Sequence, residues 1–192
     1  MKYPNALHKF VRLGVLLAIG TTGLFTPLSQ AQLVVDVTGA GSARLPIAIA
    51  DFSGERVIGS ALTSVVRADL ERSGLFKLID VPTPVGAGDT PPYADLKTRG
   101  ADALLGGTVT ASSDGRYETR LTLSDVPKQA SIAAQTYGHT SAQLRATAHR
   151  ISDFVYSKLT GEQGIFSTRI AYIVKLGGRY ELQIAEIGRA HV

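Results

Sequence analysis

Residues 45–79, LPIAIADFSGERVIGSALTSVVRADLERSGLFKLI, decide the fold of this chain. Residues 45–52 are apolar and β-compatible, and their length suits a buried strand. After a polar turn, residues 58–74 carry apolar side chains at helical spacing on one face: Ile58, Leu62, Val65, Val66 and Leu70.

The other face of this helix is charged, because Arg67, Asp69, Glu71 and Arg72 fill much of it. Gly74 stands where a helix C-terminal cap is expected, and residues 75–79 resume as a strand. A strand, a helix and a second strand in so short a segment predict a crossover unit, and therefore at least partly parallel pairing.

Downstream of this unit the pattern predicts a short helix and an antiparallel meander. Residues 93–99 form the short helix, which Gly100 stops. Strands follow at residues 103–109, 117–123 and 132–137, with the turn signal SDG at residues 113–115. Two glycines in the first of these strands, Gly106 and Gly107, indicate a bulge or a close approach of another segment.

The longest helix begins at Ser141, a residue suited to capping, and ends at Gly161. One apolar stripe runs along it, and we expect Ile151 and Val155 to be buried against the sheet: Leu144, Ala148, Ile151, Val155 and Leu159. The predicted fold class is α/β (α+β), a mixed sheet with two or three helices, over residues 32–163.

Residues 164–185 have a different character. A strongly apolar strand at residues 168–174, a turn at residues 176–179 and a returning strand at residues 180–184 predict a hairpin. A lone hairpin buries neither its faces nor its edges, so we interpret it as the opening of a second, truncated β domain.

The amino terminus has the features of a secretory signal. Lys2, Lys9 and Arg12 precede an apolar run at residues 13–23, and SQA at residues 29–31 is a small-x-small cleavage site. The run is short for a membrane anchor, so residues 1–31 are predicted to be a signal peptide that is cleaved after Ala31.

The net charge of +4 belongs mostly to this signal, because residues 32–185 hold 16 basic and 15 acidic side chains. This balance argues against a nucleic-acid-binding patch. The chain has no cysteine, so no disulfide holds its core together after export.

Few residues suggest chemistry. Asp51 lies at the carboxyl end of the first core strand, where open α/β sheets often bind ligands, and Asp102 precedes another core strand. A carboxylate pair there would suit acid–base work in an exported enzyme or small-ligand binder, and this alternative stays open. His139 and His149 are expected at the surface, and neither a metal site nor a cofactor site is predicted.

A short β-prone arm follows the predicted cleavage site and is separated from the first core strand by Gly39 and Gly41. It either pairs at a sheet edge or detaches to meet a partner. Its residues are Gln32, Leu33, Val34, Val35, Asp36 and Val37.

With these residues laid out, the chain resembles the TolB family of periplasmic proteins. The motifs that carry the likeness are VRADLERSGLF at residues 66–76, GADALLGGTV at residues 100–109, and AHRISD at residues 148–153 continuing to FSTRIAY at residues 166–172. The last of these is the most specific, and the resemblance extends to Ala185.

The resemblance implies an adaptor and not an enzyme. In that family an α/β domain precedes a β-propeller that holds Pal, an outer-membrane lipoprotein, while the N-terminal arm engages TolA of the inner membrane. The system maintains outer-membrane integrity, supports invagination at cell division and is exploited by colicins. Residues 32–37 occupy the position of the TolA-binding arm. The hairpin at residues 164–185 would open the Pal-binding propeller, whose remaining part is missing from this sequence, so Pal binding is not expected of this chain by itself.

Residues 186–192, EIGRAHV, fit neither the preceding strand nor the family. They match an in-frame translation of a common sequencing adapter. We therefore expect this tail to be non-native and the natural chain to diverge after Ala185.

Overall fold

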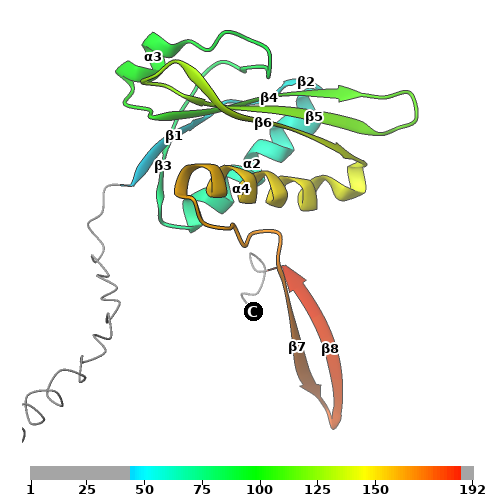
Figure 1. The fold of residues 1–192 in the computed structure, drawn as a ribbon. Coiled ribbons are helices and arrows are strands. Elements are labelled where there is room, and N and C mark those ends of the chain that lie inside the picture. The colour runs from blue at the N-terminus through cyan, green and yellow to red at the C-terminus, as the bar shows by residue number, and fades with distance from the viewer. Residues whose placement is uncertain (1–43, 187–192) are drawn as a thin grey trace, which may run out of the picture. The chain divides into compact units, whose positions relative to one another are not determined.

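The computed structural model describes residues 44–186, which fold into a mixed α/β domain followed by a β-hairpin (Figure 1). The predicted signal peptide and the end of the tail lie outside these residues. The elements in chain order are β1 (Leu45–Ile49), β2 (Ser53–Gly54), α2 (Arg56–Arg72), β3 (Phe76–Ile79), α3 (Tyr93–Thr98), β4 (Ala103–Ala111), β5 (Tyr117–Asp125), β6 (Ala130–His139), the 3-10 turn η1 (Ser141–Gln143), α4 (Leu144–Thr160), β7 (Arg169–Leu176) and β8 (Arg179–Glu186).

The sheet combines a parallel half with an antiparallel half, in the order β3-β1-β4-β5-β6. Strand β1 pairs in parallel with both β3 and β4, which confirms the predicted crossover unit. Strands β4, β5 and β6 form the predicted antiparallel meander. The two-residue strand β2, which the sequence pattern does not predict, pairs in parallel with the far end of β4.

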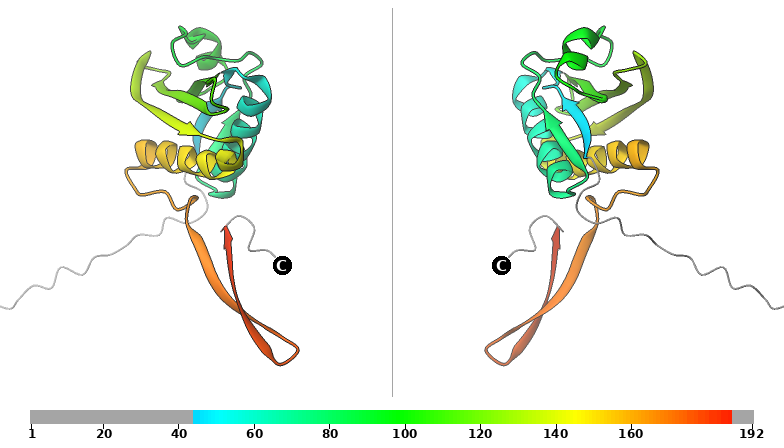
Figure 2. Two further views of the ribbon diagram at one scale, coloured as in Figure 1. Left: turned by 90° about the vertical axis from the view of Figure 1, so that its right-hand side faces the viewer. Right: turned by 90° about the vertical axis from the view of Figure 1, so that its left-hand side faces the viewer.

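Both faces of the parallel half are covered. Ile47 and Ile49 of β1 pack with apolar residues of α2 and α4 on one face. Ala48 and Ala50 pack on the other face in a smaller cluster that includes Leu96 of α3. Figures 1 and 2 show α3 and α4 on opposite sides of the sheet. This double covering explains the continuous apolar run of β1, because a strand buried on both faces has no polar side.

Helix α4 confirms the predicted apolar stripe, and both Ile151 and Val155 are fully buried. Its start differs from the prediction, because Ser141 lies in η1 and the amide of Thr140 instead donates to the side-chain oxygen of Gln143, at 3.1 Å. Its end is as predicted, with Gly161 at a positive φ of 79° that disfavours a side chain.

The glycine pair in β4 reflects a close approach and not a bulge in that strand. A Cβ on Gly107 would lie 2.8 Å from the ring of Phe52 and 3.0 Å from the carbonyl oxygen of Arg120. The irregularity of the sheet lies elsewhere, between Leu123 and Ser124, where the pairing of β5 with β6 shifts.

Strands β7 and β8 form a separate antiparallel pair, which confirms the predicted hairpin. Several of its large apolar side chains are exposed: Ile170, Ile173, Leu176, Tyr180, Leu182 and Ile184. These apolar side chains of the hairpin are therefore largely open to solvent.

Candidate functional site

The predicted partner-binding arm lies outside the described residues. Gln32, Leu33, Val34, Val35, Asp36 and Val37 all precede residue 44, where the described part of the chain begins. Their role therefore stays a prediction.

The two strand-end carboxylates do not form a pair. Asp102 lies beside Pro46 at the start of β1, where its amide donates to the Pro46 carbonyl at 2.9 Å. Asp51 follows the opposite end of β1, five residues and thus about 16 Å further along an extended chain. The alternative in which these two carboxylates act as a pair is therefore not supported, because parallel pairing of β1 with β4 places them at opposite ends of the strands.

The carboxylate of Asp51 is instead paired with two side chains of α2. Its Oδ1 lies 3.0 Å from the Arg67 guanidinium and accepts a hydrogen bond from the Thr63 hydroxyl at 3.1 Å. The same guanidinium donates to the carbonyl oxygen of Ile49 at 2.7 Å. An open hollow of about 490 Å³ lies beside Asp51. These contacts tie α2 to the end of β1, which is a structural role.

The expectation that both histidines lie at the surface is wrong. His139 is fully buried at the end of β6, where it lies 2.9 Å from the Thr119 hydroxyl and stacks on Tyr117 with ring centroids 5.7 Å apart. His149 is buried in α4. Each imidazole has a polar partner, which is what burial of such a group requires.

A buried polar cluster joins α2 to α4. The carboxylate of Asp69 accepts hydrogen bonds from His149 Nδ1 at 2.7 Å, from the Ser152 hydroxyl at 2.9 Å and from Arg72 Nη2 at 3.2 Å. Asp69, which the sequence pattern places on the charged face of its helix, is thus buried. Helix α4 packs over that side of α2 and supplies the hydrogen bonds that a buried carboxylate needs.

The cluster contains the residue types of a catalytic triad in a different order. In a nucleophilic triad the serine bonds to the imidazole, which bonds to the carboxylate. Here Ser152 and His149 both donate to Asp69, so the serine is not hydrogen-bonded to the imidazole as it is in such a triad. The arrangement joins α2 to α4.

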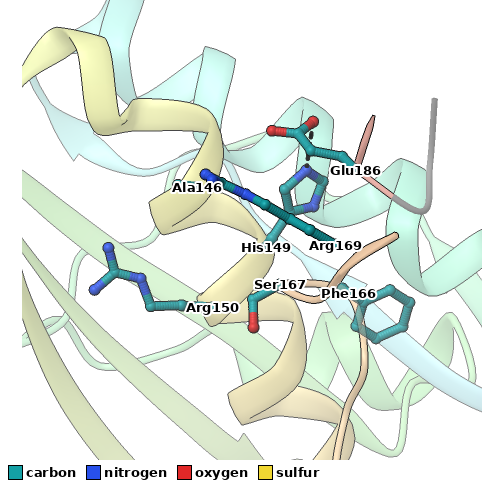
Figure 3. Close-up of a pocket in the computed structure, with 7 residues that line it drawn as sticks. All are labelled: Ala146, His149, Arg150, Phe166, Ser167, Arg169 and Glu186. Carbon is teal, nitrogen blue, oxygen red and sulfur yellow. Dashed lines mark ion pairs between the residues drawn. The ribbon is translucent and has the colours of Figure 1, made fainter. Parts of the chain in front are cut away.

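The other ring nitrogen of His149 faces a pocket of about 300 Å³ (Figure 3). The pocket lies between α4, the segment that follows it and the ends of β7 and β8, and its lining residues are Ala146, His149, Arg150, Phe166, Ser167, Arg169 and Glu186. His149 Nε2 lies 3.4 Å from Glu186 Oε2, and Arg145 Nε lies 2.6 Å from the same oxygen.

The protonation of this pair follows from its contacts. The hydrogen bond to Asp69 raises the pKa of His149 above its ordinary value, and burial opposes this only in part. The hydrogen bond from Arg145 lowers the pKa of Glu186. The pocket thus favours a charged imidazole next to a charged carboxylate.

The side chain of Asp153 in α4 holds the segment that follows this helix through a pair of hydrogen bonds, which we call the clamp. The carboxylate of Asp153 accepts hydrogen bonds from two consecutive amides, those of Phe166 at 2.7 Å and Ser167 at 3.1 Å. The Phe166 ring packs edge-on against Tyr156, with ring centroids 5.8 Å apart. A Cβ on Gly164 would lie 2.5 Å from the Asp153 Cα, so only glycine fits this passage.

Metal-ligand clusters and long apolar helices are both absent from the described residues. Within residues 44–186, no three His, Cys, Asp or Glu side chains gather closely enough to hold a metal ion. In the same part of the chain, no helix combines the length and the apolar composition that crossing a membrane requires.

A mixed sheet whose parallel half is covered on both faces, with helices α2 and α4 joined by the Asp69 cluster, defines an α/β domain. A family model described as the TolB amino-terminal domain matches residues 33–132. The chain therefore belongs to the TolB amino-terminal domain family, and the resemblance found from its motifs is confirmed.

Related proteins support this family assignment. The Tol-Pal system protein TolB of Dechloromonas aromatica is 48% identical over 184 residues, which are 95% of this chain and 42% of that protein. The protein of the same name from Aromatoleum aromaticum is 53% identical over 161 residues, which are 82% and 37% of the two chains. The chain thus spans about two fifths of the length of these relatives.

A solved structure supports the fold. The crystal structure of TolB from Acinetobacter baumannii superimposes with a TM-score of 0.64 at 30% sequence identity. The match covers 76% of this chain and 36% of that one.

Proposed function

We propose that the chain is a periplasmic component of the Tol–Pal system that acts as an adaptor through reversible protein contacts and not as an enzyme. The observation that carries this proposal is the family match over residues 33–132, together with the names of the relatives. The structure supports it in one respect, since the buried His149 and Ser152 of α4 both bond to Asp69 of α2 and thereby join two helices.

The proposal includes a route to the periplasm and a division of the chain. Residues 1–31 direct export and are removed after Ala31. Residues 32–163 form the arm and the α/β domain, residues 164–185 open a β-propeller, and residues 186–192 are a non-native tail. The linkage of TolA to Pal, and with it outer-membrane integrity and invagination at division, belongs to the whole protein, with Pal held by the propeller.

Within this chain we assign the TolA contact to residues 32–37. In an extended arm Leu33, Val35 and Val37 share one face, while Val34 and Asp36 lie on the other. Such an arm can add a strand to a sheet edge on its partner, gaining affinity from main-chain hydrogen bonds and specificity from alternate side chains. Gly39 and Gly41 then separate the arm from β1.

The test is calorimetric titration of the C-terminal domain of TolA into the exported chain. Val35→Pro removes one backbone donor and fixes the local φ, so we expect it to weaken binding about tenfold or more. Val35→Thr is the matched control, because it keeps the backbone donor and nearly the same shape.

We expect Val35→Thr to bind TolA more tightly than Val35→Pro does. Circular dichroism should give the same spectrum for both variants and the unmodified chain. Equal affinity of the Val35→Pro variant and the unmodified chain would show that the arm is not the contact.

A further inference from the structure

The end of β8 touches α4 through one carboxylate. Glu186 Oε2 lies 2.6 Å from Arg145 Nε and 3.4 Å from His149 Nε2. The three side chains differ in exposure, since His149 is only 3% exposed, whereas Arg145 is 33% and Glu186 is 24% exposed. A buried imidazole is therefore reached from outside by a partly exposed acidic side chain (Figure 3).

Asp69 fixes which nitrogen of His149 carries a hydrogen. A carboxylate accepts and does not donate, so Nδ1 holds the hydrogen that is given to Asp69 at 2.7 Å. The other nitrogen, Nε2, is buried and has no hydrogen-bond partner in the described part of the chain. When the ring is neutral, this bare Nε2 lone pair faces the Glu186 carboxylate; when it is protonated, an N–H faces the same oxygen.

The surrounding charges favour an anion at this place. Arg145 and Arg150 come from α4 and Arg169 from β7, while Asp69, already paired with Arg72, lies beneath the imidazole. Glu186 is the carboxylate that faces this group from β8.

We propose that Arg145 and His149 form a carboxylate-binding site on α4 that fastens the end of β8 to the α/β domain, and that this fastening is pH-dependent. Its occupant is the acidic side chain at position 186. The site acts as a latch between the α/β domain and the β7–β8 hairpin, and it is independent of the TolA-binding arm.

The pH dependence has a defined sign. The pKa of His149 is raised in the folded chain, so its contribution is complete below its ordinary value of 6.5 and is lost as pH rises through the raised value. The pKa of Glu186 is lowered, so its contribution is complete above its ordinary value of 4.5 and is lost on acidification. The latch is tightest between these two ordinary values.

The latch also predicts the natural sequence. We expect the natural chain to diverge after Ala185, yet a site built from Arg145 and His149 requires an acid next to it. Resequencing the locus should therefore give Asp or Glu at position 186. Any other residue there would overturn the proposal.

The direct test measures how firmly the hairpin is held. The chain has no cysteine, so Lys158→Cys on α4 and Lys175→Cys on β7 provide two unique sites for spin labels. Pulsed electron paramagnetic resonance then reports the distribution of the distance between them. We expect a narrow distribution at about pH 5.5 and one about twice as wide at about pH 8.5.

Matched variants separate charge from shape. Glu186→Gln keeps the shape without the charge and should give the wide distribution at both pH values, whereas Glu186→Asp should keep the narrow one at about pH 5.5. The latch would be overturned if the distance distribution of the unmodified chain had the same width at both pH values and the Glu186→Gln variant gave that same width.

A second measurement does not depend on the labels. Titration of the imidazoles by nuclear magnetic resonance should show that Glu186→Gln lowers the pKa of His149. An unchanged His149 titration in this variant would also overturn the proposal.

Discussion

Strand β4 and strand β7 are both strongly apolar, yet only one of them is buried. Ala103, Leu104 and Leu105 of β4 are at most 5% exposed, whereas Ile170 and Ile173 of β7 are 42% and 68% exposed. Both segments were predicted as strands from the same kind of pattern. The difference teaches that apolar side chains determine whether a segment forms a strand, while burial depends on what covers the strand.

The sharpest test of this difference compares two isoleucines. Ile151 is fully buried under the sheet, so Ile151→Ala should lower the free energy of unfolding by about 2–5 kcal/mol. Ile173→Ala, in the exposed hairpin, should change it by about 0.5 kcal/mol or less. Urea denaturation followed by circular dichroism measures both, and equal losses would contradict the contrast between domain and hairpin.

The clamp at Asp153 should have the next largest effect. Asp153→Ala leaves the amides of Phe166 and Ser167 without their acceptor and should cost about 1–3 kcal/mol. Asp95→Ala is the control, because Asp95 makes an exposed ion pair with Arg99 that should contribute about 0.5 kcal/mol or less.

Hydrogen exchange at residues 166 and 167 should accelerate in Asp153→Ala only. If the two variants lose the same free energy of unfolding and show the same exchange rates at residues 166 and 167, the Asp153 carboxylate does not stabilise the segment that follows α4.

Removing the hairpin should have the smallest effect on stability. A chain that ends at Thr168 should unfold with a free energy within about 0.5 kcal/mol of the full chain, because the sheet core does not include β7 or β8. Its monomer fraction should rise, since the exposed apolar residues and free edges of the hairpin promote association. Light scattering on the two chains decides this, and equal monomer fractions would count against it.

Local periodicity was enough to predict much of the fold. The segment at residues 45–79 contains a complete strand, helix and strand with a glycine at the helix end, and parallel pairing of β1 with β3 confirmed the crossover. The stripe that includes Ile151 and Val155 predicted the buried face of α4. Strand β2 was not predicted because two residues are too few to show a periodic pattern, and its partners in β4 lie 55 residues later in the sequence.

The polar residues were harder to predict, because their surroundings come from distant segments. Asp69 follows the pattern of a solvent face, and only the packing of α4 over α2 buries it. His149 is spaced four residues from Arg145 and three from Ser152, so the three side chains lie on one side of α4. This spacing does not indicate which residue of another segment they contact. Asp51 and Asp102 were correctly placed at strand ends, but the direction of pairing that separates them is a property of the sheet.

The hydrogen bonds of Asp69 also bear on the order in which the chain can fold. Their partners, His149 and Ser152, lie 80 and 83 residues later, so α2 emerges from a ribosome or a translocation channel long before they do. Until α4 arrives, the Asp69 side of α2 must stay in water, because a buried carboxylate without donors is strongly unfavourable. The part of the core around Asp69 can therefore close only after α4 has been made, so folding of this region depends on contacts that are distant in sequence.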